Sequence, residues 1–314
     1  MMKKYGFGVD IGGTTCKIGL FEMSGIKRES WEIPTDLSDN GSAILDNIAA
    51  AVLGKMEERG IPKEDVQGIG LGVPGPVGRD GTVFKCVNLG WGVFNVEQAL
   101  SQRTGLAVRA GNDANVAAMG EMWQGGAAGH QDVVMITLGT GVGGGIIING
   151  KMTAGHHGAA GEIGHIIVNP DETDVCGCGK KGHLEQYASA TGIVRMAMGQ
   201  LAVEKRQTVL TVIEPLTARD IFDAAKGGDV VSLELVDRLC EILAIAMADI
   251  SNVADPEVYV IGGGVSKAGT ILVDGIRRHF VERAFHACEN TEIVLAALGN
   301  DAGIYGCVRL LFDL

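Results

Sequence analysis

Residues 5–25 read YGFGVDIGGTTCKIGLFEMSG, and this stretch decides the fold class. The β-branched and apolar run before Gly12 predicts a strand, the glycine pair predicts a tight turn, and the residues after Thr14 predict a returning strand. Residues 131–150, QDVVMITLGTGVGGGIIING, repeat this pattern. Two such hairpins in one chain predict a duplicated α/β architecture, with two domains around a cleft.

The rest of the chain alternates between helical and strand patterns and ends in a helix. Apolar residues at helical spacing predict helices at residues 42–59, from about 113 onward, at 230–253 and at 301–314. Residues 257–264, EVYVIGGG, predict another strand that ends in glycines. We expect an N-terminal domain of residues 1–120, joined by the last helix, and a C-terminal domain of residues 121–300.

The composition argues against several classes of protein. Hydrophobic residues make up 46% of the chain and the mean hydropathy is +0.21, so a large buried core is expected rather than disorder. A net charge of -12 and a pI of about 5.0 argue against nucleic acid or a membrane as the main partner. The seven cysteines are scattered, and we find neither a signal peptide nor an apolar run of about 18 residues, so we expect a cytoplasmic protein.

The first glycine turn has the residues of a phosphate site. Backbone N–H groups at Gly12 and Gly13 can point together at an anion, and Thr14 can add a hydroxyl donor. Asp10, at the end of the strand, can hold Mg²⁺ directly or through water, and Lys17 follows close behind. A plain glycine turn beside a surface aspartate explains the same residues equally well.

The second glycine turn matches the dinucleotide-binding pattern G-x-G-x-x-G, with Gly139, Thr140, Gly141 and Gly144 in it. Glu162 even stands about where an acid that binds ribose would be expected. A dinucleotide fold needs a helix directly after the glycines, but the residues that follow, IIING, predict a strand. We therefore reject a dehydrogenase and interpret this turn as a second phosphate hairpin.

Two strand ends carry further candidates. Gly263 and Gly264 follow a buried strand, where bare backbone suits either a nucleotide base and ribose or a simple strand-to-helix turn. Asn112 and Asp113 stand between a strand and a helix. Asp113 can act as a general base while Asn112 holds a substrate hydroxyl, although on local grounds capping of the helix explains the aspartate better.

The segment around residues 162–185 combines carboxylates, imidazoles and thiols. Glu162, His165 and Glu185 together offer the acceptors and donors that a polyhydroxylated substrate needs, or they are solvated charges and a core histidine. Residues 174–186 read DVCGCGKKGHLEQ, with two cysteines one residue apart and a histidine five residues after the second. A metal site is only slightly favoured over a glycine loop that holds two thiols.

Seven motifs occur in a fixed order between Asp10 and Ser266: DIGGTTCK, GVPGPV, NDANVAAMGE, LGTGVGGGIIING, GEIGH, CGCGKKGHLE and IGGGVS. Together they resemble the ROK family of repressors, open reading frames and sugar kinases, and most closely its bacterial ATP-dependent glucokinases. The resemblance implies an actin-like, ribonuclease-H-like ATPase fold that closes over ATP and a hexose.

The resemblance also implies a role for each residue of the sugar site. In such kinases the aspartate matching Asp113 is the catalytic base, which takes the proton from the sugar 6-hydroxyl. The residues matching Asn112, Glu162, His165 and Glu185 bind the other hydroxyl groups.

The glycine turns, in the same way, match the ATP site of these kinases. The turns matching Gly12–Thr14 and Gly139–Gly144 hold the phosphates of ATP with Mg²⁺, and the one matching Gly262–Gly264 lies near the adenosine.

The implied partners are glucose or a related hexose, ATP and a second copy of the chain. The alternatives to a glucokinase are kinases for N-acetylglucosamine, N-acetylmannosamine, allose or fructose. A sugar sensor without catalytic activity is a further alternative that is not an enzyme. A repressor is rejected, because the first strand begins too early to leave room for a DNA-binding domain.

In the family the metal segment is C-x-C-G-x-x-G-C-x-E, with an upstream histidine as the fourth zinc ligand. Here His183 replaces the third cysteine, and His165 stands eleven residues before Cys176. Imidazole is a good zinc ligand, so we expect structural Zn²⁺ bound by His165, Cys176, Cys178 and His183. The alternative is a site with three protein ligands that is completed by water.

Overall fold

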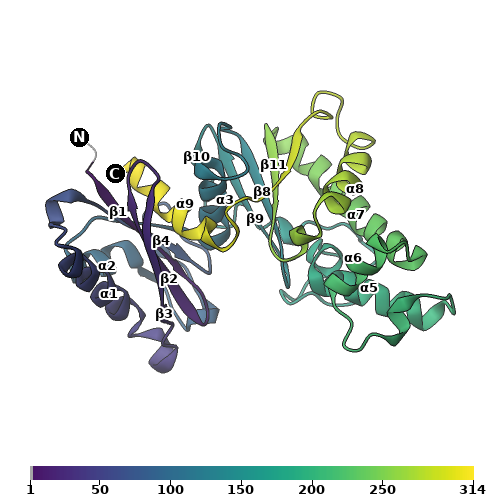
Figure 1. Cartoon of the computed structure of the whole chain (residues 1–314), viewed down its shortest axis with the longest axis horizontal. Coiled ribbons are helices and arrows are strands. Elements are labelled where there is room, and N and C mark those ends of the chain that lie inside the picture. Colours follow the sequence, from purple (N-terminus) through teal and green to yellow (C-terminus); the bar gives the residue numbers. More distant parts are fainter. Residues whose placement is uncertain (1–2) are drawn as a thin grey trace. The chain divides into compact units, whose positions relative to one another are not determined.

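The computed structural model describes residues 3–314, which divide into two compact units (Figure 1). Unit 1 takes in the N-terminal part of the chain up to Gln131, together with Gly145–Gly161 and Ala297–Leu314. Unit 2 consists of Asp132–Gly144 and Glu162–Ala296. The chain therefore passes between the units four times, whereas the sequence-based division expected a single boundary at residue 120 and a returning last helix.

The sheet of unit 1 begins with the predicted hairpin. Its strand order is β3-β2-β1-β4-β7, and the bounds are β1 (Tyr5–Ile11), β2 (Thr15–Glu22), β3 (Lys27–Pro34), β4 (Val66–Val73) and β7 (Val108–Asn112). Strands β1, β2 and β3 are antiparallel neighbours, while β4 is parallel to β1 and β7 is parallel to β4. A small second sheet pairs β5 (Thr82–Val83) with β6 (Phe94–Asn95).

The helices of unit 1 are α1 (Ile44–Arg59), α2 (Val96–Thr104), α3 (Asp113–Gln124) and α9 (Ala302–Leu310). Glycines allow α3 and α9 to pack backbone against backbone: a Cβ at Gly306 would lie 1.7 Å from the carbonyl oxygen of Val116. A Cβ at Gly70 would likewise lie 1.7 Å from the carbonyl oxygen of Cys307, so α9 also lies directly on β4. The expected boundary at residue 120 falls inside α3, and this packing keeps the whole helix in unit 1.

The second sheet has the order β10-β9-β8-β11-β12. Its strands are β8 (Val133–Leu138), β9 (Val142–Ile148), β10 (Lys151–Met152), β11 (Val258–Gly262) and β12 (Glu292–Leu295). Strand β11 is parallel to both β8 and β12. Each sheet thus runs third, second, first, fourth and fifth strand in chain order, which confirms the predicted duplication of an α/β fold.

The helices of unit 2 are α4 (Glu185–Ala188), α5 (Ala190–Val203), α6 (Ala218–Lys226), α7 (Val230–Ala254) and α8 (Thr270–Val281). Helix α7 has a fully buried face that includes Leu239, Leu243 and Met247, at the spacing that the sequence predicts. Among residues 3–314 no helix combines the length and the apolar composition that a bilayer crossing needs. Short 3-10 turns lie at Ser38–Gly41, Lys63–Asp65, Val87–Leu89, Ile163–His165, Val209–Val212, Val265–Ala268, Gly299–Asp301 and Leu311–Asp313.

Candidate functional site

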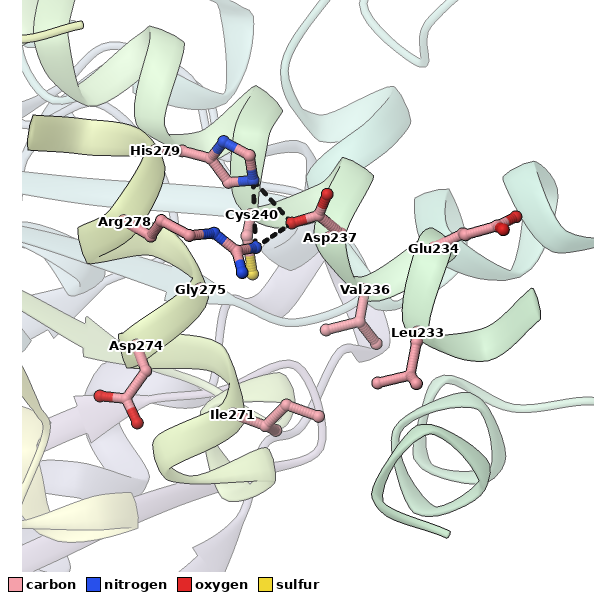
Figure 2. A pocket seen from close by; sticks show the side chains of 10 residues that line it. All are labelled: Leu233, Glu234, Val236, Asp237, Cys240, Ile271, Asp274, Gly275, Arg278 and His279. Carbon is pink, nitrogen blue, oxygen red and sulfur yellow. Dashed lines mark hydrogen bonds and ion pairs between the residues drawn. The ribbon is translucent and has the colours of Figure 1, made fainter. Parts of the chain in front are cut away.

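Pockets alone do not locate the site. A pocket of about 550 Å³ lies between α7 and α8, where Asp237 pairs with both Arg278 and His279 (Figure 2). None of the residues that the sequence singled out lines it. A second pocket, of about 800 Å³, is lined by predicted residues from separate segments of unit 2, among them Thr140, Gly141, Cys176 and Glu185. The candidate site is therefore identified by the residues that line a pocket rather than by the presence of a pocket alone.

In unit 1, β7 ends at Asn112 and α3 begins at Asp113. Asn112 is the residue that caps the helix, because its Oδ1 accepts hydrogen bonds from the N–H groups of Ala114 (3.1 Å) and Asn115 (3.2 Å). The interpretation of Asp113 as the cap is therefore wrong. Its carboxylate lies in the first turn, where Oδ1 accepts from the Ala114 N–H at 2.8 Å and from the Asn112 amide at 3.0 Å. Negative charge at this end of a helix is stabilised.

Asp10 lies at the end of β1 in the same sheet. Burial raises its pKa to about 6, and the negative charge of Asp113 adds to the increase while Lys17 opposes it. Helix α9 closes over this carboxylate, since a Cβ at Gly303 would lie 2.3 Å from Asp10 Oδ2. Two interacting carboxylates at the carboxyl ends of β1 and β7, with β4 between these strands, form a suitable binding place for a divalent cation.

Lys17 does not extend freely toward a ligand. Its ammonium group lies 2.5 Å from Asp301 Oδ1 and donates to the carbonyl of Asn300 at 3.1 Å. Lys27 pairs with the other oxygen of Asp301. In this structure Lys17 therefore ties β2 to the chain just before α9.

Two hydrogen bonds at Gly12 hold the first glycine turn, one within the turn and one from Thr35. The N–H of Gly12 donates to the carbonyl of Thr15 at 2.9 Å, and the Thr35 hydroxyl donates to the carbonyl of Gly12 at 2.7 Å. Gly13 and Thr14 at the tip are exposed, and no atom lies within 4 Å of where a Gly13 side chain would be. The exposed backbone of the tip is accessible to an anion.

The second turn is formed by Gly139–Gly141, with the Gly139 N–H donating to the carbonyl of Gly141 at 3.0 Å. Gly144 belongs to β9 and is buried, so it is not part of the turn tip. The start of α5 holds the turn: the Thr191 hydroxyl donates to the carbonyl of Thr140 at 2.7 Å. The sequence alone did not predict a role for Thr191. The one feature that could have indicated it is its position in the first turn of a helix.

The two later glycines have different roles. Gly263 has a φ of +82°, and a Cβ there would lie 2.5 Å from the carbonyl oxygen of Leu138, so glycine is required for close packing on β8. Gly264 has open space around it and lines a pocket of about 570 Å³, together with Phe222 and Lys267. Both glycines are exposed, and of the two Gly264 lines this pocket.

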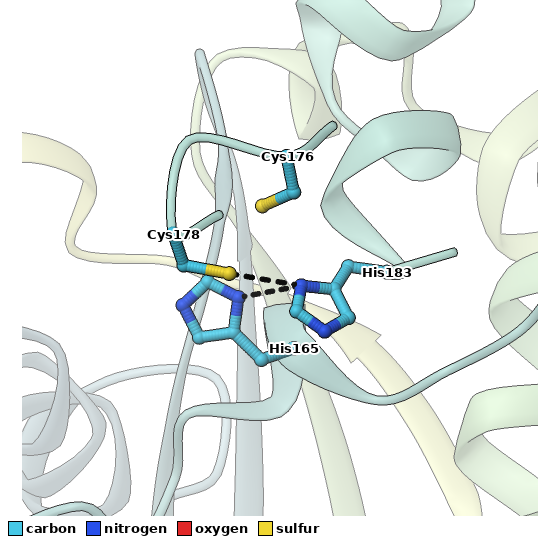
Figure 3. A group of neighbouring side chains, drawn as sticks. All are labelled: His165, Cys176, Cys178 and His183. Atoms are coloured by element: carbon cyan, nitrogen blue, oxygen red, sulfur yellow. Dashed lines mark hydrogen bonds between the residues drawn. The ribbon is translucent and has the colours of Figure 1, made fainter. Parts of the chain in front are cut away.

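The four predicted metal ligands come together. One ligand atom from each of His165, Cys176, Cys178 and His183 lies within 4.8 Å of all the others (Figure 3). Nδ1 of His183 is 3.2 Å from Nδ1 of His165 and 3.3 Å from Sγ of Cys178. In a tetrahedral zinc site with ordinary bond lengths, neighbouring ligand atoms lie about 3.3–3.8 Å apart. The donor set therefore fits a Cys₂His₂ zinc site, and the two distances from His183 Nδ1 are close to this range.

Of the predicted sugar-binding residues of unit 2, His165 belongs to this cluster and Glu185 contacts it. The Cys176 thiol donates to Glu185 Oε1 at 2.8 Å, and Glu185 Oε2 would lie 2.8 Å from a Cβ at Gly141. Glu162 directly precedes the short turn Ile163–His165, and both Glu162 and His165 are exposed. Because His165 turns Nδ1 toward the cluster, its Nε2 is left for another partner.

Two buried polar residues of α3 were missed. Asn115 donates to Asn112 Oδ1 and to the carbonyl of Ala160, both at 3.3 Å, and accepts from the N–H of Ile146 at 3.3 Å. It therefore joins Asn112 to the segment before Glu162. Its only sequence signal is a second amide in a buried helix.

Glu121 is the second missed residue, and its side chain is fully buried. Its carboxylate accepts three backbone N–H groups, from Gly126 (2.8 Å), Ala297 (2.9 Å) and Leu298 (2.8 Å). An acid in an otherwise apolar stretch is the signal that could have found it. It fixes both the end of α3 and the point where the chain re-enters unit 1.

Comparisons with known proteins identify the family of the chain. A profile of the ROK family matches residues 6–313. The chain is 43% identical to a glucokinase of Halalkalibacterium halodurans, over 98% of this chain and 94% of the relative, and 36% identical to a glucokinase of Streptomyces coelicolor, over 96% of each. It is also similar to the crystal structure of a ROK family glucokinase from Streptomyces griseus in complex with glucose and AMPPNP. That likeness has a TM-score of 0.76 at 36% identity and covers 99% of this chain and 100% of the other.

Proposed function

The chain belongs to the ROK family, with its actin-like ATPase fold, and we propose that it is a glucokinase that transfers the γ-phosphate of ATP to the 6-hydroxyl of glucose. The observation that carries the proposal is the pair Asp10 and Asp113, placed at the ends of β1 and β7, where the negative charge of Asp113 raises the pKa of Asp10. The names of the most similar relatives and of the Streptomyces griseus structure support glucose and ATP as substrates.

Asp113 is the proposed general base. As the sugar oxygen bonds to the γ-phosphorus and the bond to the departing ADP breaks, the proton of the 6-hydroxyl passes to the Asp113 carboxylate. The Asn112 amide donates to Asp113 Oδ1 at 3.0 Å and so holds the carboxylate in place. Its longer bond, 3.3 Å to the carbonyl of Gly75, is the one that a substrate hydroxyl would replace.

The phosphates of ATP are assigned to the two glycine turns. Exposed backbone at Gly13 and Thr14 in unit 1, and at Thr140 in unit 2, supports this assignment. Mg²⁺, when bound, neutralises the negative charge of the phosphates, and Asp10 is the residue proposed to hold it. Gly264 and its pocket are assigned to the adenosine.

Sugar binding in unit 2 is assigned to Glu162, His165 and Glu185. Two carboxylates accept from hydroxyl groups, while the free ring nitrogen of His165 can donate or accept, so neighbouring hydroxyls can all be satisfied. Structural Zn²⁺ is proposed at His165, Cys176, Cys178 and His183, on the strength of the spacing of their ligand atoms. The metal would hold His165 and the start of α4 together and thereby orient the sugar-binding residues.

We further propose a homodimer in the cytoplasm. The seven cysteines are all free thiols, which suits a reducing compartment, and structural zinc bound by thiolates needs the same conditions. Size-exclusion chromatography with light scattering tests the dimer.

An assay of ADP release across a panel of sugars tests the function. Glucose, fructose, allose, N-acetylglucosamine and N-acetylmannosamine are compared by kcat/KM, with the Asp113→Asn protein as a blank for contaminating kinases. We expect glucose to have the highest kcat/KM. A higher value for an amino sugar would reassign the substrate, and tight glucose binding without ADP release would instead identify a sugar sensor.

A further inference from the structure

One side chain contacts both ends of the loop that carries the metal ligands. Arg195 lies on α5, and its guanidinium group is 2.8 Å from a carboxylate oxygen of Glu172 and 2.8 Å from one of Asp174. On its other edge, Nε donates to the carbonyl of Gln186 at 3.3 Å. Cys176, Cys178 and His183 all lie between these attachment points. Arg195 therefore closes the loop independently of any metal.

The contact to Glu172 is reinforced by Tyr187. The Tyr187 hydroxyl donates to the Glu172 carboxylate and accepts from the Asn169 amide at 2.7 Å. The Arg195 guanidinium carbon also lies 5.0 Å from the centre of the Tyr187 ring. The Glu172 side chain is only 9% exposed, so these interactions are shielded from water. Arg195 and Tyr187 together hold the pKa of Glu172 at about 2, and it stays charged at neutral pH.

Gln186 links the start of the loop to a metal ligand through two hydrogen bonds. Its amide nitrogen donates to the carbonyl of Asp174 at 3.0 Å, and its amide oxygen accepts the N–H of His183, also at 3.0 Å. Gln186 is also the neighbour of Glu185 in α4. The start of the loop and the last metal ligand thus belong to one hydrogen-bonded network, and the sugar-binding Glu185 is next to it in the chain.

We propose that Arg195 is a positioning residue that holds this loop in its metal-binding conformation and keeps Glu185 in place for the sugar. The inference rests on the proposed zinc site and on the proposed role of Glu185. A loop whose two ends are already joined loses less conformational freedom when it binds zinc, and it opens less often to release it. Planar, two-sided bridging of this kind requires arginine, because lysine offers only a point charge.

The test is the release of zinc from the purified, zinc-loaded protein to an excess of a chelating dye. Arg195→Met keeps the aliphatic stem and removes all five N–H donors, and we expect release to become about 10–100 times faster, as for other outer partners of metal ligands. The KM for glucose should rise about tenfold while kcat and the KM for ATP change less than about threefold. Arg238→Met is the matched control, because that arginine is 61% exposed on α7 and pairs with Glu241 three residues on in the same helix.

A second variant keeps the inference testable if Arg195→Met does not fold. Tyr187→Phe removes only the hydroxyl that supports Glu172, and zinc release should become about two to five times faster. Arg195→Lys should resemble Arg195→Met rather than the native protein. The inference would be overturned if both Arg195→Met and Tyr187→Phe released zinc at the native rate. It would also be overturned if these variants had a lower Tm but released zinc no faster than the native protein. If the native protein holds zinc but phosphorylates no sugar, the proposed glucokinase activity alone is refuted. If the native protein binds no zinc, the proposed role of Arg195 is refuted.

Discussion

The Nδ1 atoms of His165 and His183 face each other at 3.2 Å, although the residues are 18 positions apart in the chain. The same nitrogen of His183 also faces Cys178 Sγ at 3.3 Å. A ring nitrogen has either one hydrogen or one lone pair, so Nδ1 of His183 cannot make a good hydrogen bond to both neighbours at once. A cation between these atoms resolves the competition, which is why the geometry supports His183 as the replacement for the third cysteine of the family motif.

His183→Ala should therefore remove the metal. We expect about one zinc per chain in the native protein and well under half of that in the variant, because three remaining ligands bind zinc far more weakly. His183→Cys, which restores the family motif, should retain it. Elemental analysis of protein purified without a polyhistidine tag measures both. Full zinc content in His183→Ala would show that water completes the site instead.

Asp113→Asn should nearly abolish turnover while sugar binding survives. The amide has the size of the carboxylate but cannot accept the proton of the 6-hydroxyl, so kcat should fall about 10²–10⁴-fold. Single-turnover kinetics give kcat, and isothermal titration gives the Kd for glucose. More than a few per cent of native kcat in the variant would contradict the assignment of Asp113 as base.

Asp10 should make stability and nucleotide binding depend on pH in opposite directions. Its pKa is raised to about 6 in the folded protein, so its contribution to stability is complete below the ordinary value of 3.8 and is lost as the pH rises through 6. Asp10→Asn should therefore be about 1–3 kcal/mol more stable than the native protein at pH 8, and show no gain at pH 4. Urea unfolding at several pH values measures this difference.

Mg²⁺ binding should show the opposite trend for the same residue. A proton on Asp10 competes with the cation, so the affinity of the native protein for Mg²⁺ and ATP should fall below pH 6. Asp10→Asn should bind Mg²⁺ and ATP weakly at every pH. A variant that kept native affinity would show that Asp10 does not hold the metal.

Glu121→Ala should destabilise the protein severely. Its carboxylate accepts three backbone N–H groups in a fully buried place, and their exposure to an apolar cavity should cost about 3 kcal/mol or more. Glu121→Gln should cost less, because one oxygen remains as an acceptor. Thermal melting and urea unfolding measure both variants. An effect below about 1 kcal/mol for Glu121→Ala would mean that water or a shifted backbone replaces the carboxylate.

Local patterns were enough to predict much of the fold. The hairpin through Gly12, the helix that begins at Asp113 and the long α7 all depend on alternation, turn residues or helical spacing within one segment, and the structure confirms them. The pairing of the first two strands of each sheet follows from the two similar hairpins. The path of the chain between the units could not be predicted, because it depends on glycine contacts such as Gly306 on Val116 between segments far apart in the chain.

The sequence by itself determined which residue types are present and in what order: the acids, the glycine turns, and the cysteine pair with His183 in place of a cysteine. Only the tertiary structure decided how they are used. It made Asn112 rather than Asp113 the helix cap, engaged Lys17 with Asp301, and placed His165 against His183. The physical reason is that capping, pairing and ligation are decided by distances of about 3 Å between side chains, and such distances are set by the packing of whole elements rather than by sequence spacing.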